Sequence, residues 1–363
     1  MDVLLCRAST LTWSQSISPC LHSSAKPFSR CEAKKFRVFC TSDHTQKASQ
    51  MTVSVTGATG FIGRRLVQRL QADNHQVRVL TRSRSKAELI FPGKKTRFFP
   101  GVMIAEEPQW RDCIQGSTAV VNLAGTPIGT RWSSEIKKEI KESRIRVTSK
   151  VVDLINESPE GVRPSVLELV KPKYLMRAAH QEMITWLSDY CAKVYCLVSF
   201  NRGVLVCREW EGTALKVNKD VRLALIRIGI VLGKDGGALA KMIPLFMMFA
   251  GGPLGSGQQW FSWIHLDDIV NLIYEALSNP SYRGVINGTA PNPVRLAEMC
   301  DHLGNVLGRP SWLPVPEFAL KAVLGEGAFV VLEGQRVVPA RAKELGFPFK
   351  YRYVKDALKA IMS

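Results

Sequence analysis

Three glycines at three-residue spacing, Gly57, Gly60 and Gly63, are the residues whose type and spacing most clearly suggest chemistry. A β-branched run at 53–56 precedes them and an amphipathic pattern follows, which predicts a strand, a tight turn and a helix N-terminus. The first two glycines would let the backbone approach a pyrophosphate, whose charge the helix N-terminus favours, and Gly63 would let the helix pack closely on the strand. The alternative is a tight turn without a ligand, and the strand-and-helix context favours the nucleotide.

Cations follow the next predicted strand, residues 76–81. An acid that reads the ribose of NAD would stand here, yet none occurs between residues 74 and 87. Arg82, Arg84 and Lys86 stand there instead, and cations suit the 2′-phosphate of NADP(H). The alternative is a solvated basic loop on a basic protein.

Small residues end a third predicted strand, within 117–125, just after the polar Asn122. Such residues let a cofactor ring lie against the backbone at the carboxyl end of a strand. The predicted cofactor-binding residues are Gly57, Thr59, Gly60, Phe61, Ile62, Gly63, Thr81, Arg82, Lys86, Asn122, Leu123, Ala124 and Gly125.

Several motifs together resemble one known family. They are 56–63 (TGATGFIG), 122–128 (NLAGTPI) with Arg131-Trp132, 207–211 (CREWE), 227–233 (RIGIVLG) with Gly236-Gly237, 263–268 (WIHLDD), and the stretch from 313–316 (LPVP) to Gly346-Phe347. In these the chain resembles the SulA-like epimerase family of atypical, extended short-chain dehydrogenase/reductases. The resemblance covers most of residues 51–363 apart from one block.

The resemblance implies a fold and a function. The expected fold is α/β, a Rossmann-type, doubly wound, mostly parallel sheet with a small C-terminal substrate or cap region, and the alternation of strands and helices up to residue 160 agrees with it. The expected function is an NADP(H)-dependent oxidoreductase or epimerase acting on an unidentified small molecule. A plastid member of the family is linked to chloroplast division, which implies plastid-division proteins as partners.

The first 50 residues differ in composition from the rest. They hold nine serines, four of the nine cysteines, seven Lys/Arg and three Asp/Glu, without a sustained apolar stretch. This composition is typical of an organelle transit peptide, and the alternative is a disordered tail. With the resemblance, it predicts a protein of the chloroplast stroma, with peripheral contact at the stromal side of the inner envelope as a further option.

The remaining residues carry +14 of the net charge of +18 and five cysteines without metal-ligand spacing. No metal site is predicted. No apolar window is long enough to span a membrane, although a basic surface would be attracted to anionic lipid. Nucleic acid is not expected as a partner, because the cations are dispersed rather than interleaved with aromatic residues.

The catalytic residues are unknown from the sequence. A short-chain dehydrogenase normally needs a Tyr-x-x-x-Lys pair on one helical face, so that the lysine lowers the tyrosine pKa. The only such spacing joins Tyr351 to Lys355, far outside the expected order, and we interpret it as chance. This absence leaves an alternative function, a non-catalytic NADP(H)-binding regulatory or scaffold protein in plastid division.

One block, residues 165–206, does not match the family. It lacks the family's Val-rich strand, serine and Gly-Tyr-Tyr-Gly turn, and we hypothesise a retained intron, a misassigned exon or a frameshift. The sheet would lose its fifth strand or replace it with 165–170 or 193–199, while 181–195 could form a helix.

The expected domains are a transit peptide at 1–50, a Rossmann domain at 51–235 and a C-terminal substrate-side region at 236–363. A helix is predicted from Ser133 to Asn156 and a strand at 221–228. Asp267 or Asp268 is expected to cap a helix at 269–277, and His265 to be structural rather than a general base.

Overall fold

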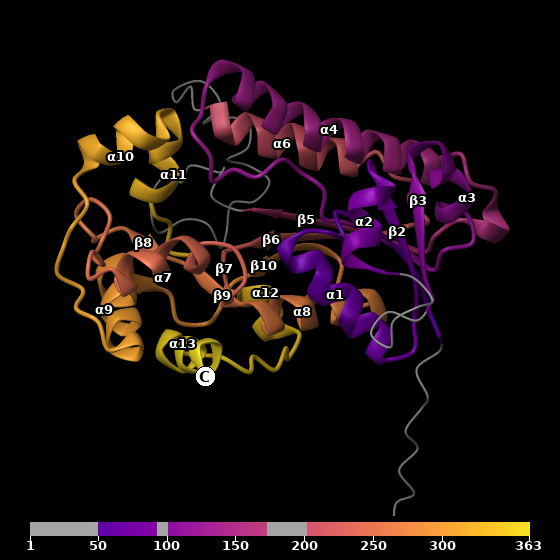
Figure 1. Cartoon of the computed structure of the whole chain (residues 1–363). Coiled ribbons are helices and arrows are strands. Elements are labelled where there is room, and N and C mark those ends of the chain that lie inside the picture. The colour runs from indigo at the N-terminus through magenta and orange to yellow at the C-terminus, as the bar shows by residue number, and fades with distance from the viewer. Residues whose placement is uncertain (1–49, 93–100, 173–201) are drawn as a thin grey trace, which may run out of the picture. The chain divides into compact units, whose positions relative to one another are not determined.

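A seven-stranded parallel sheet runs through the part of the chain that the computed structural model describes, residues 50–92, 101–172 and 202–363 (Figure 1). Its strands, in spatial order, are β10 (Gly284–Gly288), β6 (Arg222–Ile228), β5 (Val166–Pro172), β4 (Ala119–Asn122), β1 (Thr52–Thr56), β2 (Gln76–Thr81) and β3 (Val102–Glu106). Every neighbouring pair is parallel. The order reverses beside β1, which confirms the predicted doubly wound Rossmann-type fold.

The strands read as nearly continuous apolar runs because both faces of the sheet are covered. Val53 and Val55 of β1 are fully buried, and Val53 lies in register between Val77 of β2 and Ala119 of β4. The predicted strands at 76–81 and 221–228 are confirmed as β2 and β6.

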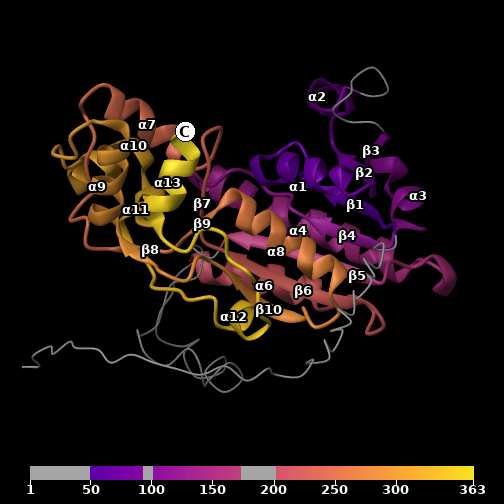
Figure 2. The ribbon, with the colours of Figure 1, turned by 90° about the horizontal axis from the view of Figure 1, so that it is seen from below.

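Helices cover both faces of the sheet. Helices α1 (Phe61–Ala72) and α8 (Leu266–Ser278) pack on one face, as Figure 2 shows, through the core that includes Leu66 and Ile273. Helices α3 (Trp110–Ile114), α4 (Ser134–Asn156) and α6 (Arg202–Ala214) pack on the other. Helix α4 confirms its prediction, since the hydroxyl of Ser133 accepts from the Ile136 N–H as the N-cap.

The block 165–206, which the motif comparison left outside the family resemblance, supplies a central strand. β5 pairs with β4 on one side and β6 on the other, with Lys171 opposite Arg227. The sheet therefore keeps a fifth strand, formed by the first of the two predicted candidates. The second candidate at 193–199, the helix at 181–195 and the predicted transit peptide lie outside the described residues.

The C-terminal residues build a second cluster beside the sheet. Its elements are β7 (Ile230–Leu232), α7 (Leu239–Met247), β8 (Trp260–Phe261), β9 (Trp263–His265), β11 (Val294–Arg295), α9 (Leu296–Leu307), α10 (Glu317–Leu324), α11 (Phe329–Leu332) and α13 (Val354–Met362). Helix α12 (Ala340–Glu344) instead packs on β10, and its Ala342 lies in the core of the main sheet. Trp263, Met299 and Leu358 are buried at its centre. β10 and α8 also lie beyond residue 235, yet they complete the main sheet and its cover.

Candidate functional site

The turn after β1 brings the first glycine against the end of β4. Gly57 has φ of +67°, and a Cβ there would lie 2.7 Å from the carbonyl carbon and oxygen of Leu123. Only glycine adopts this conformation and tolerates this approach without strain. Gly60 then turns the chain, its N–H donating to the Gly57 carbonyl at 3.0 Å.

The N-terminus of α1 is open to an anion. Gly60 is its N-cap and supplies no side-chain cap, and the first turn contains no acidic residue. A Cβ at Gly63 would lie 2.4 Å from the Gly57 carbonyl oxygen, so this glycine lets the helix pack onto the loop. Backbone N–H groups and the helix dipole thus meet at a turn where no side chain caps the helix, and the residues fit a pyrophosphate.

The ring of Phe61 is turned away from this turn. A Cβ at Gly236 would lie 2.5 Å from the Phe61 ring, and one at Gly233 would lie 2.7 Å from it. The phenyl group therefore packs against the turn that follows β7. Of the predicted cofactor-binding residues, Phe61 offers a ligand its backbone rather than its side chain.

A buried chain of hydrogen bonds fixes the end of β4. Thr56 donates through its hydroxyl to Oδ1 of Asn122 at 2.7 Å, and Nδ2 of Asn122 donates to Oγ1 of Thr148 at 2.9 Å. The indole N–H of Trp210 donates to the same Thr148 oxygen at 2.6 Å, and the Ala124 N–H donates to Asn122 Oδ1. The network ties β1, β4, α4 and α6 together beside the glycine loop. Sequence reasoning missed Thr148 and Trp210, since they come from distant helices.

The loop after β4 rests on a buried cation. Arg144 of α4 donates to the carbonyls of Ile140 and Thr126, and its guanidinium lies 5.4 Å from the Trp210 ring centre. A Cβ at Gly125 would lie 3.0 Å from this guanidinium. Gly125, which is predicted to face the cofactor, therefore also has to be small because the Arg144 guanidinium packs against it.

The predicted cations lie on the surface beside the end of β2. Arg82 and Lys86 are exposed and, within the described residues, form no ion pair, whereas Arg84 pairs with Glu88 at 2.9 Å. Lys86 lies in α2 (Arg84–Ile90). The hydroxyl of Thr81 accepts from the Ser83 N–H and shapes the turn. β1 pairs with both β2 and β4, so the predicted cofactor residues gather at the carboxyl ends of three neighbouring strands.

An ion cluster occupies the carboxyl end of β5. Lys171 is fully buried and lies 2.6 Å from Oε1 of Glu211, and Arg227 binds both oxygens of this carboxylate. Burial alone would raise the pKa of Glu211, but the hydrogen bonds from Arg227 and Lys171 lower it below its ordinary value. Helix α6 contains no tyrosine, so the described residues place no Tyr/Lys pair here.

Glu168 is buried in the middle of the sheet. Its side chain is fully enclosed, both carboxyl oxygens lack a hydrogen-bond partner among the described residues, and its neighbours across the strands are Val121 and Ala224. Burial raises its pKa well above the ordinary value, and Arg222 opposes this only in part. Burial therefore favours the protonated, neutral form of this carboxyl group.

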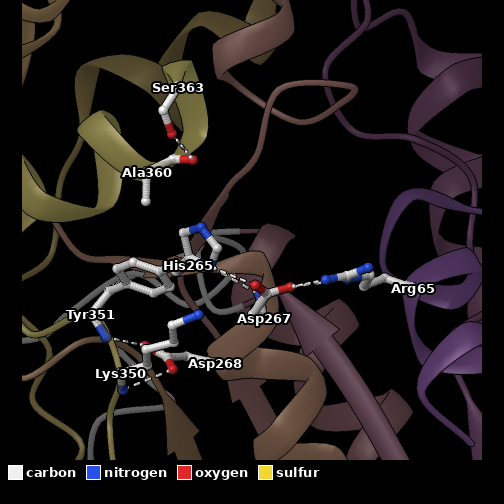
Figure 3. Close-up of polar contacts among 8 residues, drawn as sticks. All are labelled: Arg65, His265, Asp267, Asp268, Lys350, Tyr351, Ala360 and Ser363. Carbon is white, nitrogen blue, oxygen red and sulfur yellow. Dashed lines mark hydrogen bonds and ion pairs between the residues drawn. The ribbon is translucent and has the colours of Figure 1, made fainter. Parts of the chain in front are cut away.

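The cap of α8 corrects one prediction. His265 caps the helix, since its Nδ1 accepts from the Asp267 N–H at 3.0 Å, and neither aspartate is the N-cap (Figure 3). Asp267 instead binds Arg65 of α1 at 2.9 Å, and Asp268 accepts from the Lys350 and Tyr351 backbone N–H groups. An imidazole can replace a carboxylate as cap because its unprotonated nitrogen accepts equally well.

The His265 ring is enclosed and stacked on Tyr351, with ring centres 3.9 Å apart. Burial, followed by the charges of Lys350 and Arg65, lowers its pKa to about 4 against the opposing effect of Asp267. The neutral ring keeps Nδ1 available as the cap acceptor. This geometry confirms the structural role predicted for His265.

The loop after β4 is also held from the C-terminal cluster. Trp132 is buried against Gly327 and Phe329, its N–H donates to the Leu324 carbonyl, and its indole N–H donates to the Ile128 carbonyl. Lys241 of α7 donates to the Gly129 carbonyl. The loop after β4 is therefore fixed to residues 324–329 and to α7.

The described residues contain neither a metal-binding cluster nor a membrane-spanning helix. In those parts of the chain, His, Cys, Asp and Glu side chains form no cluster that could hold a metal ion. None of the helices described there has the length and apolar character needed to cross a membrane.

Comparisons with known proteins give the family. The NAD dependent epimerase/dehydratase family matches residues 53–168, and a domain of unknown function (DUF1731) matches residues 315–361. The chain is 68% identical over 363 residues to epimerase family protein SDR39U1 homolog, chloroplastic, of Arabidopsis thaliana, with 99% of each chain covered. It is 33% identical over 317 residues to human epimerase family protein SDR39U1, covering 86% of this chain and 100% of the human one.

Solved structures agree with these relatives. The crystal structure of human SDR39U1 with NADPH matches with a TM-score of 0.72 at 30% identity, covering 86% of this chain and 99% of that one. The structure of MoeE5 with UDP-glucose and NAD, at 18% identity and a TM-score of 0.64, shares the fold, covering 86% of this chain and 97% of that one. The resemblance inferred from the motifs is confirmed. This chain belongs to the epimerase family of extended short-chain dehydrogenase/reductases.

Proposed function

We propose that this chain binds NADP(H) at the carboxyl ends of β1, β2 and β4. The observation that carries the proposal is the turn at Gly57, Gly60 and Gly63, where the backbone packs too closely for a Cβ and the helix N-terminus has no side-chain cap. A pyrophosphate is the anion that such a turn binds after a first parallel strand. The NADPH in the solved human relative supports the choice of cofactor.

The phosphorylated cofactor is preferred because of the charges at the end of β2. Arg82 and Lys86 are exposed and engage no described carboxylate, and no acid follows β2 directly to read an unmodified ribose. Guanidinium and ammonium groups bind a 2′-phosphate by charge-assisted hydrogen bonds. Asn122, Ala124 and Gly125 would border the nicotinamide end.

Titration of the full chain with NADPH and with NADH, followed by calorimetry, tests the proposal. We expect NADPH to bind more tightly, and Arg82→Gln with Lys86→Gln to weaken NADPH binding about tenfold, or about 1.4 kcal/mol, with little effect on NADH. Lys219→Gln, an exposed cation on the distant α6–β6 turn, is the matched control. Equal affinities of the wild-type chain for both cofactors would contradict the role of these cations, and no binding of either would contradict the proposed function.

The reaction class proposed is that of an oxidoreductase or epimerase on a small molecule in the plastid. Bound NADP(H) would supply hydride transfer, while Trp132 and the loop after β4 would shape the space next to it. The chloroplastic relative at 68% identity supports the plastid location. The transit peptide and the stromal location remain proposals that import of a tagged full chain into isolated chloroplasts tests.

A second candidate function is cofactor binding without turnover, in plastid division. The observation that favours it is the cluster of Lys171, Glu211 and Arg227, in which both cations bind one carboxylate at the carboxyl end of β5, so that the cluster presents no free acid and base. Incubation with deuterated NADPH and plastid extract separates the two. Deuterium transfer to any extract metabolite supports the enzyme, and tight binding without transfer supports the regulatory protein.

A further inference from the structure

Two arginines flank one tryptophan in the C-terminal cluster. The Arg295 guanidinium lies 3.8 Å from the ring centre of Trp260, and the Arg336 guanidinium lies 5.3 Å from it. Trp260 begins β8 and is paired in register with Arg295 of β11, whereas Arg336 arrives from a segment some forty residues later in the chain. Three separate segments thus gather two positive charges around one indole.

The two guanidinium groups and the indole N–H together offer more donors than the described acceptors satisfy. Neither arginine forms an ion pair with a carboxylate among the described residues, and Arg295 donates to the Gln258 carbonyl. The indole N–H of Trp260 is buried without an acceptor in the same part of the chain. Two like charges beside one ring repel each other, and an oxyanion is the partner that would satisfy both guanidinium groups.

Arg336 is held on a fixed support. The Ser262 hydroxyl donates to the Gln335 carbonyl at 2.6 Å and accepts from the Val337 N–H at 2.9 Å, which fixes the backbone on both sides of Arg336. Gly334 lies so close to Trp260 that a Cβ would approach its carbonyl oxygen to 2.1 Å. The exposed guanidinium therefore extends from an anchored backbone rather than from a free loop.

This support lies at the carboxyl edge of the main sheet. The Ile230 N–H, just past β6, donates to the Ser262 carbonyl at 2.8 Å, and Thr289, just past β10, contacts the Val337 carbonyl. The same C-terminal segment begins at Gly325, which bridges to Trp132 above the loop after β4. Residues 325–337 thus run from the loop after β4 to the ends of β6 and β10, along the edge where ligands of open α/β sheets bind.

We propose that Arg295 and Arg336, supported by Trp260, bind an oxyanion, phosphate or carboxylate, on the small molecule that the protein holds opposite its cofactor. The inference rests on the proposed function for the presence of that cofactor, and adds that the substrate class is anionic. Stacking on the indole orients the guanidinium planes, and their N–H edges remain free to donate.

Binding of inorganic pyrophosphate and of citrate to the full chain tests the proposal, measured by calorimetry with and without saturating NADPH. The NADPH present in one arm blocks the glycine loop, so that binding there is not counted. We expect Arg336→Gln and Arg295→Gln each to weaken binding of the preferred anion at least tenfold and to leave NADPH affinity unchanged. Arg352→Gln, an exposed cation near the chain end, is the matched control.

The results of this experiment distinguish a failure of the anion site from a failure of NADP(H) binding. Preference for pyrophosphate assigns a phosphate-bearing substrate, and preference for citrate assigns a carboxylate-bearing one. NADPH binding without anion binding, or an equal loss in Arg352→Gln, overturns this inference and leaves the proposed function standing. Anion binding that the two variants do not change also overturns it. Because Arg336 is exposed, its variant remains informative if Arg295→Gln lowers stability.

Discussion

A single carboxyl group is the least favourable residue in the core. Glu168 stands between apolar strands with both oxygens unpaired in the described structure, whereas buried carboxyl groups normally find donors or ion pairs. Its burial costs about 1–3 kcal/mol even when it is protonated. Lys171, on the opposite face of the same strand, escapes this cost because Glu211 neutralises it.

Glu168→Val should stabilise the protein. We expect a gain of about 2 kcal/mol, or about 4 °C in the unfolding midpoint, because the polar group is removed without a cavity. The raised pKa sets the pH dependence: above about pH 4.3 the unfolded carboxyl releases a proton that the native one retains, so native stability falls as pH rises toward the folded pKa. The advantage of the variant should therefore grow with pH.

Thermal unfolding of both proteins between pH 4 and pH 8 checks this prediction. Glu160→Val, at an exposed position, is the control and should change stability by less than about 0.5 kcal/mol. An advantage of Glu168→Val that shrinks as pH rises would contradict the assignment of a buried, neutral carboxyl group.

His265 should produce the opposite pH dependence. Its pKa is lowered to about 4, so between this value and about 6.5 the unfolded ring binds a proton that the native ring does not, and stability falls as pH decreases through this window. His265→Asn keeps a cap acceptor and removes the titration. The acid-induced fall in the unfolding midpoint should shrink by about 2 °C, while the control His302→Asn, at a partly exposed position in α9, should leave that fall unchanged.

At the scale of elements, β5 shows that a strand with a buried carboxyl group can still form in the centre of a sheet. Residues 166–170 carry enough apolar side chains to pair with β4 and β6, so the strand forms despite Glu168. The misfit of Glu168 supports the hypothesis that residues 165–206 derive from altered splicing or a frameshift. Sequencing of transcripts across this region should reveal a form with a different segment here, and finding this sequence alone would contradict the hypothesis.

The contact between α1 and the glycine loop gives a prediction at this scale. Gly63→Ala should weaken NADPH binding and lower stability by about 2 kcal/mol, because its Cβ would lie 2.4 Å from the Gly57 oxygen and push the helix from the loop. Gly161→Ala, where no atom lies within 4 Å, is the control. Unchanged NADPH affinity in Gly63→Ala, measured by calorimetry, would show that the helix N-terminus does not hold the cofactor.

At the scale of the whole molecule, the main sheet and its core are built from strands and helices that lie far apart in the sequence. Residues 49–363 cluster as one unit, with β10 and α8 arriving after residue 235. A chain ending at residue 235 should therefore lack a cooperative unfolding transition, because the edge of the sheet and the apolar cover of Ile269 and Ile273 are missing. Calorimetry beside the full chain checks this, and a sharp transition that NADPH shifts would show that residues 51–235 fold independently.

The sequence by itself determined the local features of this protein. The glycine spacing, the cations after β2 and the cap at Ser133 each depend on neighbours within a few residues, so type and spacing sufficed to predict the βα turn, the strands and α4. The same local logic failed at α8, where His265 caps the helix in place of the expected aspartate.

Only the tertiary structure decided which distant side chains meet. Thr148 and Trp210 complete the network of Asn122, Arg336 reaches Trp260, and β5 enters the sheet because pairing across strands and burial outweigh a poor local sequence. These contacts join residues that lie between 26 and 76 positions apart in the chain. Their free energy depends on the packed environment and not on the adjacent residues, which is why the linear pattern does not contain them.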